Sequence, residues 1–289
     1  MTTYVLYNPL AGKGWENIEE KLRRHMPDVD PTVIDMTGIK DYVEFFGGTT
    51  PEDQVILCGG DGTLNRFVND TYGMEIPCEL LYFAAGSGND FLKDLGKSGD
   101  HAPFPVKEYF RDLPTVTVKG KTYRFINGVG LGLDGYCCAE VTRAKRDGVK
   151  KNYITVALRA FLKDYHPANA EITVDGKTYS YEKVWLVPTM KGRYFGGGIP
   201  AAPDQDRRGK RVTLLLMHHA PRLLALLCFP SFMKGKHYKY KNIIAVHPGH
   251  EITVKFDRPT DMQIDGEMVE NVTSYSVSVS TDRQISDTL

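Results

Sequence analysis

The sequence predicts an α/β domain followed by an all-β domain. Short apolar runs alternate with helical patterns up to about residue 112, and hairpin patterns dominate after Pro114. Alternation of this kind builds βαβ units around a parallel sheet, here a doubly wound, Rossmann-like one. The hairpins of the second half, with one helical stretch among them, predict an antiparallel β-sandwich.

In the first half, expected strands and helices follow one another in the order 3–7, 13–25, 32–36, 39–47, 54–58, 63–70, 80–84 and 88–95. In the second half, we expect hairpins at 116–125 and 171–181, a helix at 152–164, and further strands near 183–189, 211–217, 242–247, 251–256 and 268–280. We place the domain boundary after residue 125, which gives domains of 1–125 and 126–280.

Composition narrows the classes of function. The 289 residues include 36 basic and 36 acidic side chains, so the net charge is zero and we expect no nucleic-acid partner. Five cysteines, an odd number without C-x-x-C spacing, argue against a disulfide framework or a structural zinc site. No signal peptide and no apolar run long enough to span a bilayer are evident, so we expect a cytoplasmic protein.

A glycine loop directly follows the buried strand expected at 54–58. It reads Gly59-Gly-Asp-Gly-Thr-Leu-Asn65 and runs into a helical pattern. Glycines let the backbone approach an anion, and the first amides of a helix point outward without internal partners. The loop therefore predicts a phosphate site, while a tight turn that binds nothing stays the plain alternative.

Two similar turns flank this loop, one at 8–14 and one at 85–92. Ligands of open parallel sheets bind outside the carboxyl ends of the strands, so we expect the three turns to form one crevice. Neither a P-loop nor a Gly-x-Gly-x-x-Gly fingerprint occurs. Thr37 follows another expected strand; it either faces the same crevice or caps the next helix.

Three segments together resemble the signatures of the diacylglycerol kinase catalytic family, which includes bacterial soluble lipid kinases and sphingosine and ceramide kinases. They are Asn8-Pro-x-Ala-Gly12, the Gly59–Asn65 loop, and Gly86-Ser-Gly-Asn-Asp-Phe91. The Gly-Gly-Asp-Gly core alone is shared with phosphofructokinases and NAD kinases. The resemblance implies an NAD kinase/diacylglycerol kinase-like fold with the active site between the domains. It also implies that residues 281–289 return to the first domain.

The resemblance implies ATP and Mg²⁺ as cofactors. The implied nucleotide-binding residues are Gly59, Gly60, Asp61, Gly62, Thr63 and Asn65, with support from Asn8, Thr37, Ser87, Asn89 and Asp90. Lys13 and Arg66 are candidate phosphate neighbours. The implied reaction is transfer of the γ-phosphoryl group to a lipid hydroxyl, with diacylglycerol as the expected lipid and phosphatidic acid as the product.

Candidate catalytic carboxylates lie in two places. Asp265-Gly-Glu267 reads by itself as a hairpin turn, but the resemblance implies that it supplies the base for the lipid hydroxyl. Phosphoryl transfer to an alcohol needs such a carboxylate. We favour Glu267 as the base with Asp265 in support, although sequence does not separate them. Asp61 could instead contact Mg²⁺ through water or receive the substrate hydroxyl.

The chain departs from the family pattern at 204–211. Soluble bacterial kinases usually carry Asp-Asp-Gly-x-Leu-Asp there and hold a structural Mg²⁺, whereas this chain reads Asp-Gln-Asp206-Arg207-Arg-Gly-Lys-Arg. Asp206 is the candidate metal ligand, and a charged surface loop is the alternative. A glycine-dense passage at 127–135 is either a second nucleotide loop or a set of hinge or packing glycines.

The most lipophilic stretch is 223–233, with lysines directly behind it. It reads as a buried amphipathic helix, or as a helix that lines a lipid cleft or touches a bilayer. The expected partners are a lipid alcohol substrate and a peripheral membrane surface, and a homodimer is left open. Alternative functions are a small-molecule kinase of the NAD-kinase or phosphofructokinase type, and a non-catalytic lipid-binding regulator.

Overall fold

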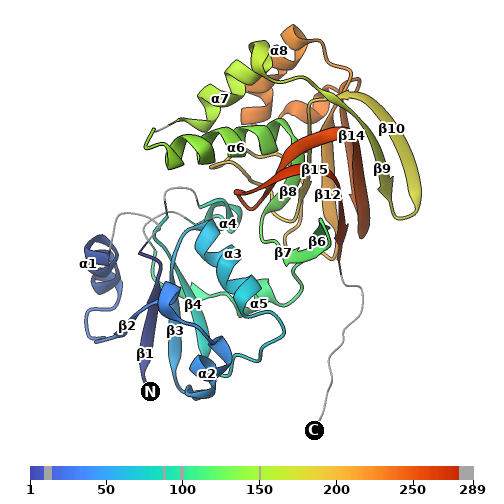
Figure 1. The fold of residues 1–289 in the computed structure, drawn as a ribbon. Coiled ribbons are helices and arrows are strands. Elements are labelled where there is room, and N and C mark those ends of the chain that lie inside the picture. The colour runs from blue at the N-terminus through green and yellow to red at the C-terminus, as the bar shows by residue number, and fades with distance from the viewer. Residues whose placement is uncertain (10–14, 87–88, 98–100, 150, 280–289) are drawn as a thin grey trace. The chain divides into compact units, whose positions relative to one another are not determined.

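The computed structural model describes residues 1–9, 15–86, 89–97, 101–149 and 151–279. Contacts within the chain divide it into two compact units, Met1–Arg111 and Asp112–Leu289 (Figure 1). Each unit has its own sheet and its own core, as predicted, and the two are described separately below.

The first unit is built on a five-stranded sheet in the order β2-β1-β3-β4-β5. Strands β1 to β4 are parallel, and the short β5 joins β4 in the antiparallel direction. The strands are β1 (Thr3–Tyr7), β2 (Thr32–Asp35), β3 (Gln54–Gly59), β4 (Glu79–Ala84) and β5 (Phe104–Pro105). The helices are α1 (Trp15–His25), η1 (Met36–Gly38), α2 (Tyr42–Gly47), α3 (Asp61–Asp70), α4 (Asp90–Asp94) and α5 (Lys107–Phe110).

Helices cover both faces of this sheet, which confirms the doubly wound prediction. On one face, Ile18 and Leu22 of α1 pack with Val5 and Ile56 in a buried cluster. Helices α2, α3 and α5 lie on the other face (Figure 1). They meet through Phe67 of α3, whose ring contacts aromatic rings of α2 and α5. Because successive strand residues point to opposite faces, the continuous apolar runs of β3 and β4 supply both cores.

The second unit has an antiparallel sheet whose main path runs β13-β12-β11-β8-β14-β15-β6-β7, with the β9–β10 hairpin added to β14. Its strands are β6 (Thr115–Val118), β7 (Lys121–Arg124), β8 (Gly128–Gly132), β9 (Ala168–Val174), β10 (Lys177–Val184), β11 (Leu186–Met190), β12 (Val212–Met217), β13 (Ile244–Gly249), β14 (Glu251–Ile264) and β15 (Glu267–Ser278). The helices are α6 (Leu133–Arg146), α7 (Tyr153–Arg159), η2 (Ala160–Asp164), α8 (Arg222–Met233) and η3 (His237–Lys239).

The strands of the second unit form the predicted sandwich. The register of β14 against β15 shifts between Lys255 and Met262, as β-bulges do where a strand bends. One apolar cluster takes side chains from β6, β8, β9, β11, β12, β14 and β15. The buried Tyr275 hydroxyl of β15 lies 3.1 Å from Val187 O and 3.0 Å from Thr189 Oγ1 of β11, which is not a neighbouring strand. Helices α6, α7 and α8 gather on one side of the strands (Figure 1).

The domain boundary lies earlier than we predicted. The hairpin β6–β7, which the sequence prediction assigned to the first domain, pairs through Val116 with Val277 of β15. Its buried valines belong to the sandwich core. The second unit therefore begins at Asp112 rather than after residue 125. Residues 281–289 lie outside the described part of the chain, so their predicted return to the first domain stays a prediction.

The glycine-dense passage at 127–135 forms strand β8 and the start of α6, which supports the packing interpretation. A Cβ on Gly130 would lie 2.9 Å from Pro188 Cα, and one on Gly135 would lie 2.0 Å from Asp261 O. Only residues without a side chain fit between α6, β8 and their neighbours. The five cysteines are all buried and unpaired.

We expect Gly135→Ala to destabilise the protein by about 3 kcal/mol, because the methyl group must displace the β14 backbone. Gly47→Ala is the matched control, since it also lies in a helix and has open space around it. That substitution should be neutral or stabilise by up to about 1 kcal/mol. Thermal unfolding followed by circular dichroism measures both. Equal melting temperatures in the two variants would contradict the packing of α6 on β14.

Candidate functional site

The carboxyl ends of four strands lie along one edge of the first sheet. Asn8 follows β1, Thr37 lies in η1 behind β2, Gly60 follows β3, and Gly86 follows β4. The chain leaves β1 toward β2 on one side and places β3 on the other, so a topological switch point lies between β1 and β3. A ligand crevice is expected at this point. The structure thus brings the described starts of the predicted loops to one edge of the sheet.

The loop behind β3 presents the bare N-terminus of a helix. Gly60 is the N-cap of α3, a helix of ten residues, and no side chain caps it. A Cβ on Gly59 would lie 2.3 Å from Thr63 Oγ1, so only glycine lets the helix start this close to the strand. Uncapped amides and the helix dipole favour a bound anion.

The second glycine loop touches the first one. A Cβ on Gly86 would lie 2.5 Å from Gly60 Cα, so the two backbones are in direct contact. Ala85 N donates to Gly59 O at 2.9 Å, and the buried Tyr82 hydroxyl donates to the same oxygen at 2.9 Å. The turns behind β3 and β4 therefore form one continuous backbone surface.

Asp61 ties these two turns together. Its Oδ2 accepts a hydrogen bond from Asp90 N at 2.7 Å, and its Oδ1 accepts one from Phe91 N at 3.0 Å. The carboxylate of one glycine loop thus caps the helix α4 that follows the other. We had predicted a contact to Mg²⁺ or to the substrate hydroxyl. The geometry adds a positioning role. The contact with Mg²⁺ or substrate stays a prediction.

The other predicted residues of this edge fall into three groups. Thr63 and Asn65 are buried within α3, and the Asn65 backbone oxygen accepts a hydrogen bond from the Asn69 side chain. Their contact with nucleotide stays a prediction. Asn89 Nδ2 donates to Gly86 O at 2.9 Å and shapes the second loop. Thr37 donates through both its N–H and its hydroxyl to Asp35 Oδ1, so Asp35 is the cap of η1.

The structure does not test the predicted roles of Lys13, Ser87 and Arg66. Lys13 and Ser87 lie outside the described residues. Arg66 makes an exposed ion pair with Asp70 at 3.3 Å on the surface of α3. Its predicted contact with phosphate stays a prediction.

In the second unit, Asp265 holds the backbone that leads into β8. Its carboxylate accepts hydrogen bonds from Ile126 N at 2.5 Å, Asn127 N at 2.8 Å and Gly128 N at 2.9 Å. Asp265 itself has a φ of 47°, a left-handed conformation that aspartate tolerates in turns. Three amide donors fix the carboxylate in place, which favours an anchoring role for Asp265 over that of a base.

Glu267 lies in a different environment, although only one residue separates it from Asp265. It is exposed at the start of β15, directly after the Asp265-Gly266 turn. That turn is held by Gly266 N, which donates to Gln263 Oε1 at 3.0 Å. A firmly held turn that carries an exposed carboxylate suits a general base. The structure therefore distinguishes the two carboxylates that sequence left together.

Arg207 is a residue that the sequence analysis underestimated. It is buried, and its guanidinium donates to Ile126 O at 2.7 Å and to Asn127 Oδ1 at 2.6 Å. The same loop therefore donates its N–H groups to Asp265 and accepts hydrogen bonds from Arg207. Lys191 is buried nearby and donates to Gly209 O, and burial, then the Arg207 charge, lowers the pKa of its ammonium group.

The predicted metal ligand Asp206 gains no support. Its Oδ1 accepts from Arg208 N at 2.9 Å, a local turn contact. In the parts of the chain that the structure describes, no three His, Cys, Asp or Glu side chains come together as a metal site would require. The structural metal site stays a prediction.

Asp134 is a second residue that sequence reasoning missed. It lies in the first turn of α6, fully buried beside a narrow apolar pocket whose walls include Cys137, Phe161 and Phe229. Neither carboxyl oxygen has a hydrogen-bond partner of ordinary geometry. Burial raises the pKa of Asp134 to about 7, and weaker contacts with Gln263 and backbone amides only partly oppose this. The sequence signal that could have identified Asp134 is its position as a lone acidic residue in the glycine-rich, apolar run 128–135.

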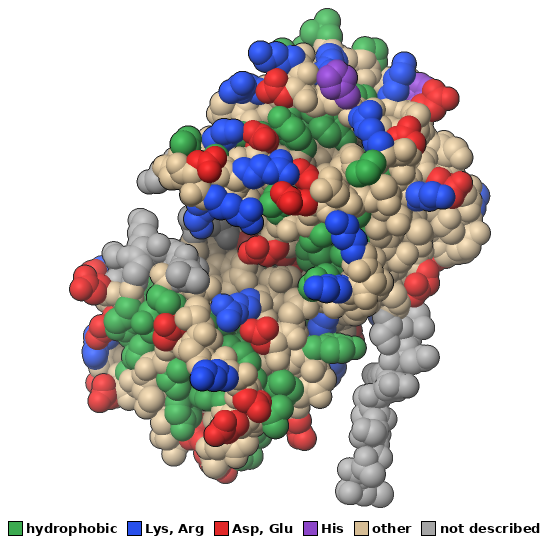
Figure 2. Space-filling model, viewed as in Figure 1, with side chains coloured by type: hydrophobic (Ala, Val, Ile, Leu, Met, Phe, Trp, Pro, Cys, Tyr) green, Lys and Arg blue, Asp and Glu red, His purple; other side chains and the backbone are tan. Residues whose placement is uncertain are grey.

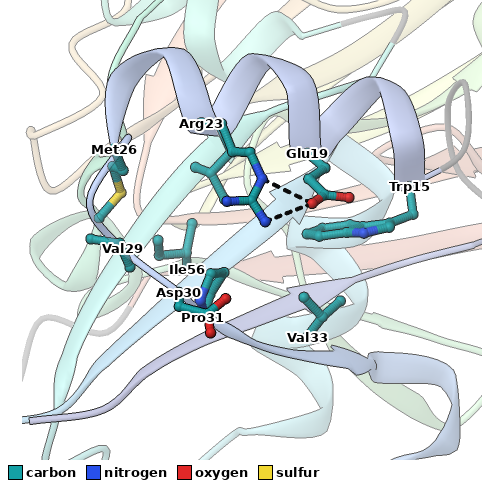
Figure 3. Close-up of a pocket in the computed structure, with 10 residues that line it drawn as sticks. Trp15, Glu19, Arg23, Met26, Val29, Asp30, Pro31, Val33 and Ile56 are labelled. Carbon is teal, nitrogen blue, oxygen red and sulfur yellow. Dashed lines mark hydrogen bonds and ion pairs between the residues drawn. The ribbon is translucent and has the colours of Figure 1, made fainter.

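A different hollow lies under α1 in the first unit (Figure 3). Trp15 forms one end, Met26 and Val29 the other, and the Glu19–Arg23 ion pair lies over it. None of its lining residues belongs to the glycine loops, so we do not assign it to the phosphate site.

Together, a parallel sheet with a Gly-Gly-Asp-Gly turn beside its switch point and an antiparallel sandwich define the NAD kinase/diacylglycerol kinase-like fold. Residues 2–112 match the family model "Diacylglycerol kinase catalytic domain", and residues 127–281 match "YegS C-terminal NAD kinase beta sandwich-like domain". The second match alone spans more than half of the chain. The chain therefore belongs to the diacylglycerol kinase catalytic family with a YegS-type C-terminal domain.

Individual proteins agree with this assignment. The Bacillus subtilis (strain 168) protein named "Putative lipid kinase YtlR" is 23% identical over 294 residues, which cover 92% of this chain and 93% of that protein. A Staphylococcus aureus (strain Newman) protein named "Putative lipid kinase" is 27% identical and covers 75% of this chain and 71% of its own length. A crystal structure titled as a putative diacylglycerol kinase from Bacillus anthracis str. Sterne shares the fold, with a TM-score of 0.69 at 20% identity, over 96% of this chain and 94% of that chain.

The raised pKa of Asp134 predicts a pH-dependent stability. An exposed aspartate titrates near 4, whereas folded Asp134 holds its proton up to about pH 7. The folded state is therefore favoured below about pH 4, and this advantage is lost as the pH rises through about 7. In the wild type, this effect lowers the free energy of unfolding by up to about 4 kcal/mol between pH 4 and pH 8. Asp134→Asn should lack this decrease and be the more stable protein at pH 8.

Urea unfolding from pH 4 to pH 8 measures the effect. Asp147→Asn, at the exposed end of the same helix, is the matched control and should keep the wild-type profile. A parallel pH profile for wild type and Asp134→Asn would contradict a buried, protonated Asp134.

Proposed function

We propose that this protein is an ATP-dependent lipid kinase that phosphorylates the hydroxyl of diacylglycerol to give phosphatidic acid. The observation that carries the proposal is the contact between the two glycine turns, held by Asp61, beside the uncapped N-terminus of α3. This is a rigid anion-binding surface at the point of the sheet where nucleotides bind. Membership in the diacylglycerol kinase catalytic family supports the same reaction class.

The first unit would hold ATP through its phosphates. Backbone amides at Gly60 and Gly62 would face the anion, and the absence of side chains there suits a close approach. Mg²⁺ is commonly held by one or two carboxylates together with phosphate oxygens and water. Asp61, half-buried at the edge of this loop, fits that demand, so a dense metal cluster is not needed. Bound Mg²⁺ would neutralise charge on the transferred phosphoryl group.

The second unit would supply the base. Glu267 would accept the proton of the lipid hydroxyl as the oxygen–phosphorus bond forms. Asp265 and Arg207 would act as positioning residues, because both hold the segment next to the Asp265–Glu267 turn. Asp265 accepts hydrogen bonds from three amides of this segment. Arg207 donates to Ile126 O and to the Asn127 side chain. The names of the relatives favour a lipid over a water-soluble acceptor.

Transfer of labelled phosphate from ATP-Mg²⁺ to lipids in mixed micelles tests the proposal. We expect labelled phosphatidic acid from diacylglycerol, and a loss of kcat of about a hundredfold or more in Glu267→Gln. Glu270→Gln is the matched control, because it removes another exposed carboxylate from the same strand, and it should keep full activity. If label instead appears on NAD or a sugar phosphate, or if Glu267→Gln is fully active, the proposed reaction or its base is wrong.

The role of Asp61 can be measured without turnover. Asn keeps one acceptor but turns an amide donor toward a backbone N–H, so Asp61→Asn should bind a non-hydrolysable ATP analogue about tenfold more weakly. Asp70→Asn, in the exposed ion pair of the same helix, is the control and should bind normally. Isothermal titration calorimetry provides both constants. Unchanged affinity in Asp61→Asn would show that the link between the two loops is not needed for nucleotide binding.

A further inference from the structure

Six exposed aliphatic side chains lie on two packed helical segments of the second unit. Leu223 and Leu227 of α8 are 68% and 64% exposed, and Leu162 of η2 is 61% exposed. Leu224, Leu158 and Ile154 are exposed to a smaller degree. We call these six residues the leucine face. Isolated exposed leucines are ordinary, but six on adjoining segments need an explanation.

The spacing shows that the leucine face consists of two stripes. Ile154, Leu158 and Leu162 are four residues apart, and Leu223 and Leu227 are also four apart, so each set lies along one side of its helical segment. The opposite sides are buried: Ala225, Cys228 and Phe232 of α8, and Val156 of α7, belong to the apolar cluster beneath. From the sequence, only the α8 stretch is expected to be either buried or in contact with lipid. The structure shows that α8 has one buried side and one exposed side.

The two segments are joined firmly. Arg222, at the start of α8, donates to Phe161 O at 3.1 Å and to Tyr165 O at 2.9 Å at the end of η2. The rings of Phe161 and Phe229 are in contact below the surface. The stripes are therefore parts of one rigid surface, which does not have to fold before it binds a partner.

The chain in and after α8 is positively charged, and the one acidic residue of η2, Asp164, is paired with Arg159 at 3.5 Å. Residues 221–250 contain five Lys and Arg residues but no Asp or Glu, although the whole chain has no net charge. The segment that follows α8 in the chain carries four exposed lysines, Lys234, Lys236, Lys239 and Lys241. Exposed Lys163 directly follows Leu162. In Figure 2, hydrophobic side chains protrude at the top of the view over α8, with Lys and Arg side chains beside them. Aliphatic side chains beside cations match the acyl and headgroup layers of an anionic bilayer.

From this arrangement we infer that the leucine face docks the protein onto an anionic lipid bilayer. The leucines enter the acyl boundary, and the lysines behind α8 lie against anionic headgroups. Every helix among the described residues is too short or too polar to span a membrane, so the inferred contact is peripheral. The inference deepens the proposed function and rests on it in one respect: the bilayer would be the source of the lipid substrate.

Vesicle co-sedimentation without ATP and without diacylglycerol tests the docking alone. Wild type should bind vesicles of phosphatidylcholine mixed with phosphatidylglycerol, more weakly at high salt. The double variant Leu223→Glu/Leu227→Glu should bind at least about a hundredfold more weakly, about tenfold for each buried leucine replaced. Val43→Glu/Tyr72→Glu, which changes two exposed apolar residues of the first unit, is the matched control and should bind as wild type does.

Two further measurements separate the possible failures. Unchanged vesicle binding by the leucine variant would overturn the inference. So would a wild-type dimer that the variant abolishes in analytical ultracentrifugation, because the face would then join two copies of this chain. Phosphorylation of dispersed short-chain diacylglycerol should be equal in wild type and variant. Vesicle binding without any phosphorylation would support the docking and refute the lipid kinase activity. Phosphorylation without vesicle binding would support the lipid kinase activity and refute the docking.

Discussion

Carboxylates that hold backbone amides determine the shape of both candidate sites. Asp61 accepts the amides of Asp90 and Phe91 in the first unit, and Asp265 accepts the amides that lead into β8 in the second. Amides at tight turns have no partner in a helix or a sheet, and leaving them unpaired away from water is costly. An ionised carboxylate satisfies several at once and fixes the turn rigidly. Both candidate sites depend on this arrangement.

The two units use different residue types to shape these turns: glycines in the first unit and a buried arginine in the second. In the first unit, Gly60 and Gly86 remove side chains so that two turns touch and a bare helix terminus is exposed. In the second unit, the buried guanidinium of Arg207 donates to Ile126 O and to the Asn127 side chain, in the same segment whose amides donate to Asp265. A glycine surface favours an anion, whereas a firmly anchored turn presents one carboxylate, Glu267, to solvent. Nucleotide binding and proton acceptance require these two kinds of surface.

Much of the fold could be predicted because its signals are local. The alternation of strands and helices, the strand-turn-helix glycine loops and the Asp-Gly hairpins depend on neighbouring residues alone. The boundary at residue 125 was wrong because the hairpin β6–β7 could have joined either sheet, and its partner residues in β15 lie about 160 residues later in the chain. Asp265 and Glu267 could not be separated either, since their difference lies in three amides contributed by residues 126–128.

The sequence by itself determined the two-part architecture, the glycine loops and the candidate carboxylates, because period, turn chemistry and motif spacing are properties of short segments. Only the tertiary structure decided which carboxylate anchors and which one is exposed, that Arg207 is buried, that Asp134 lies without ordinary hydrogen bonds in an apolar core, and that leucines of α7, η2 and α8 share one surface. Burial, pairing and exposure depend on residues far apart in the chain. Those contacts exist only after the strands have packed.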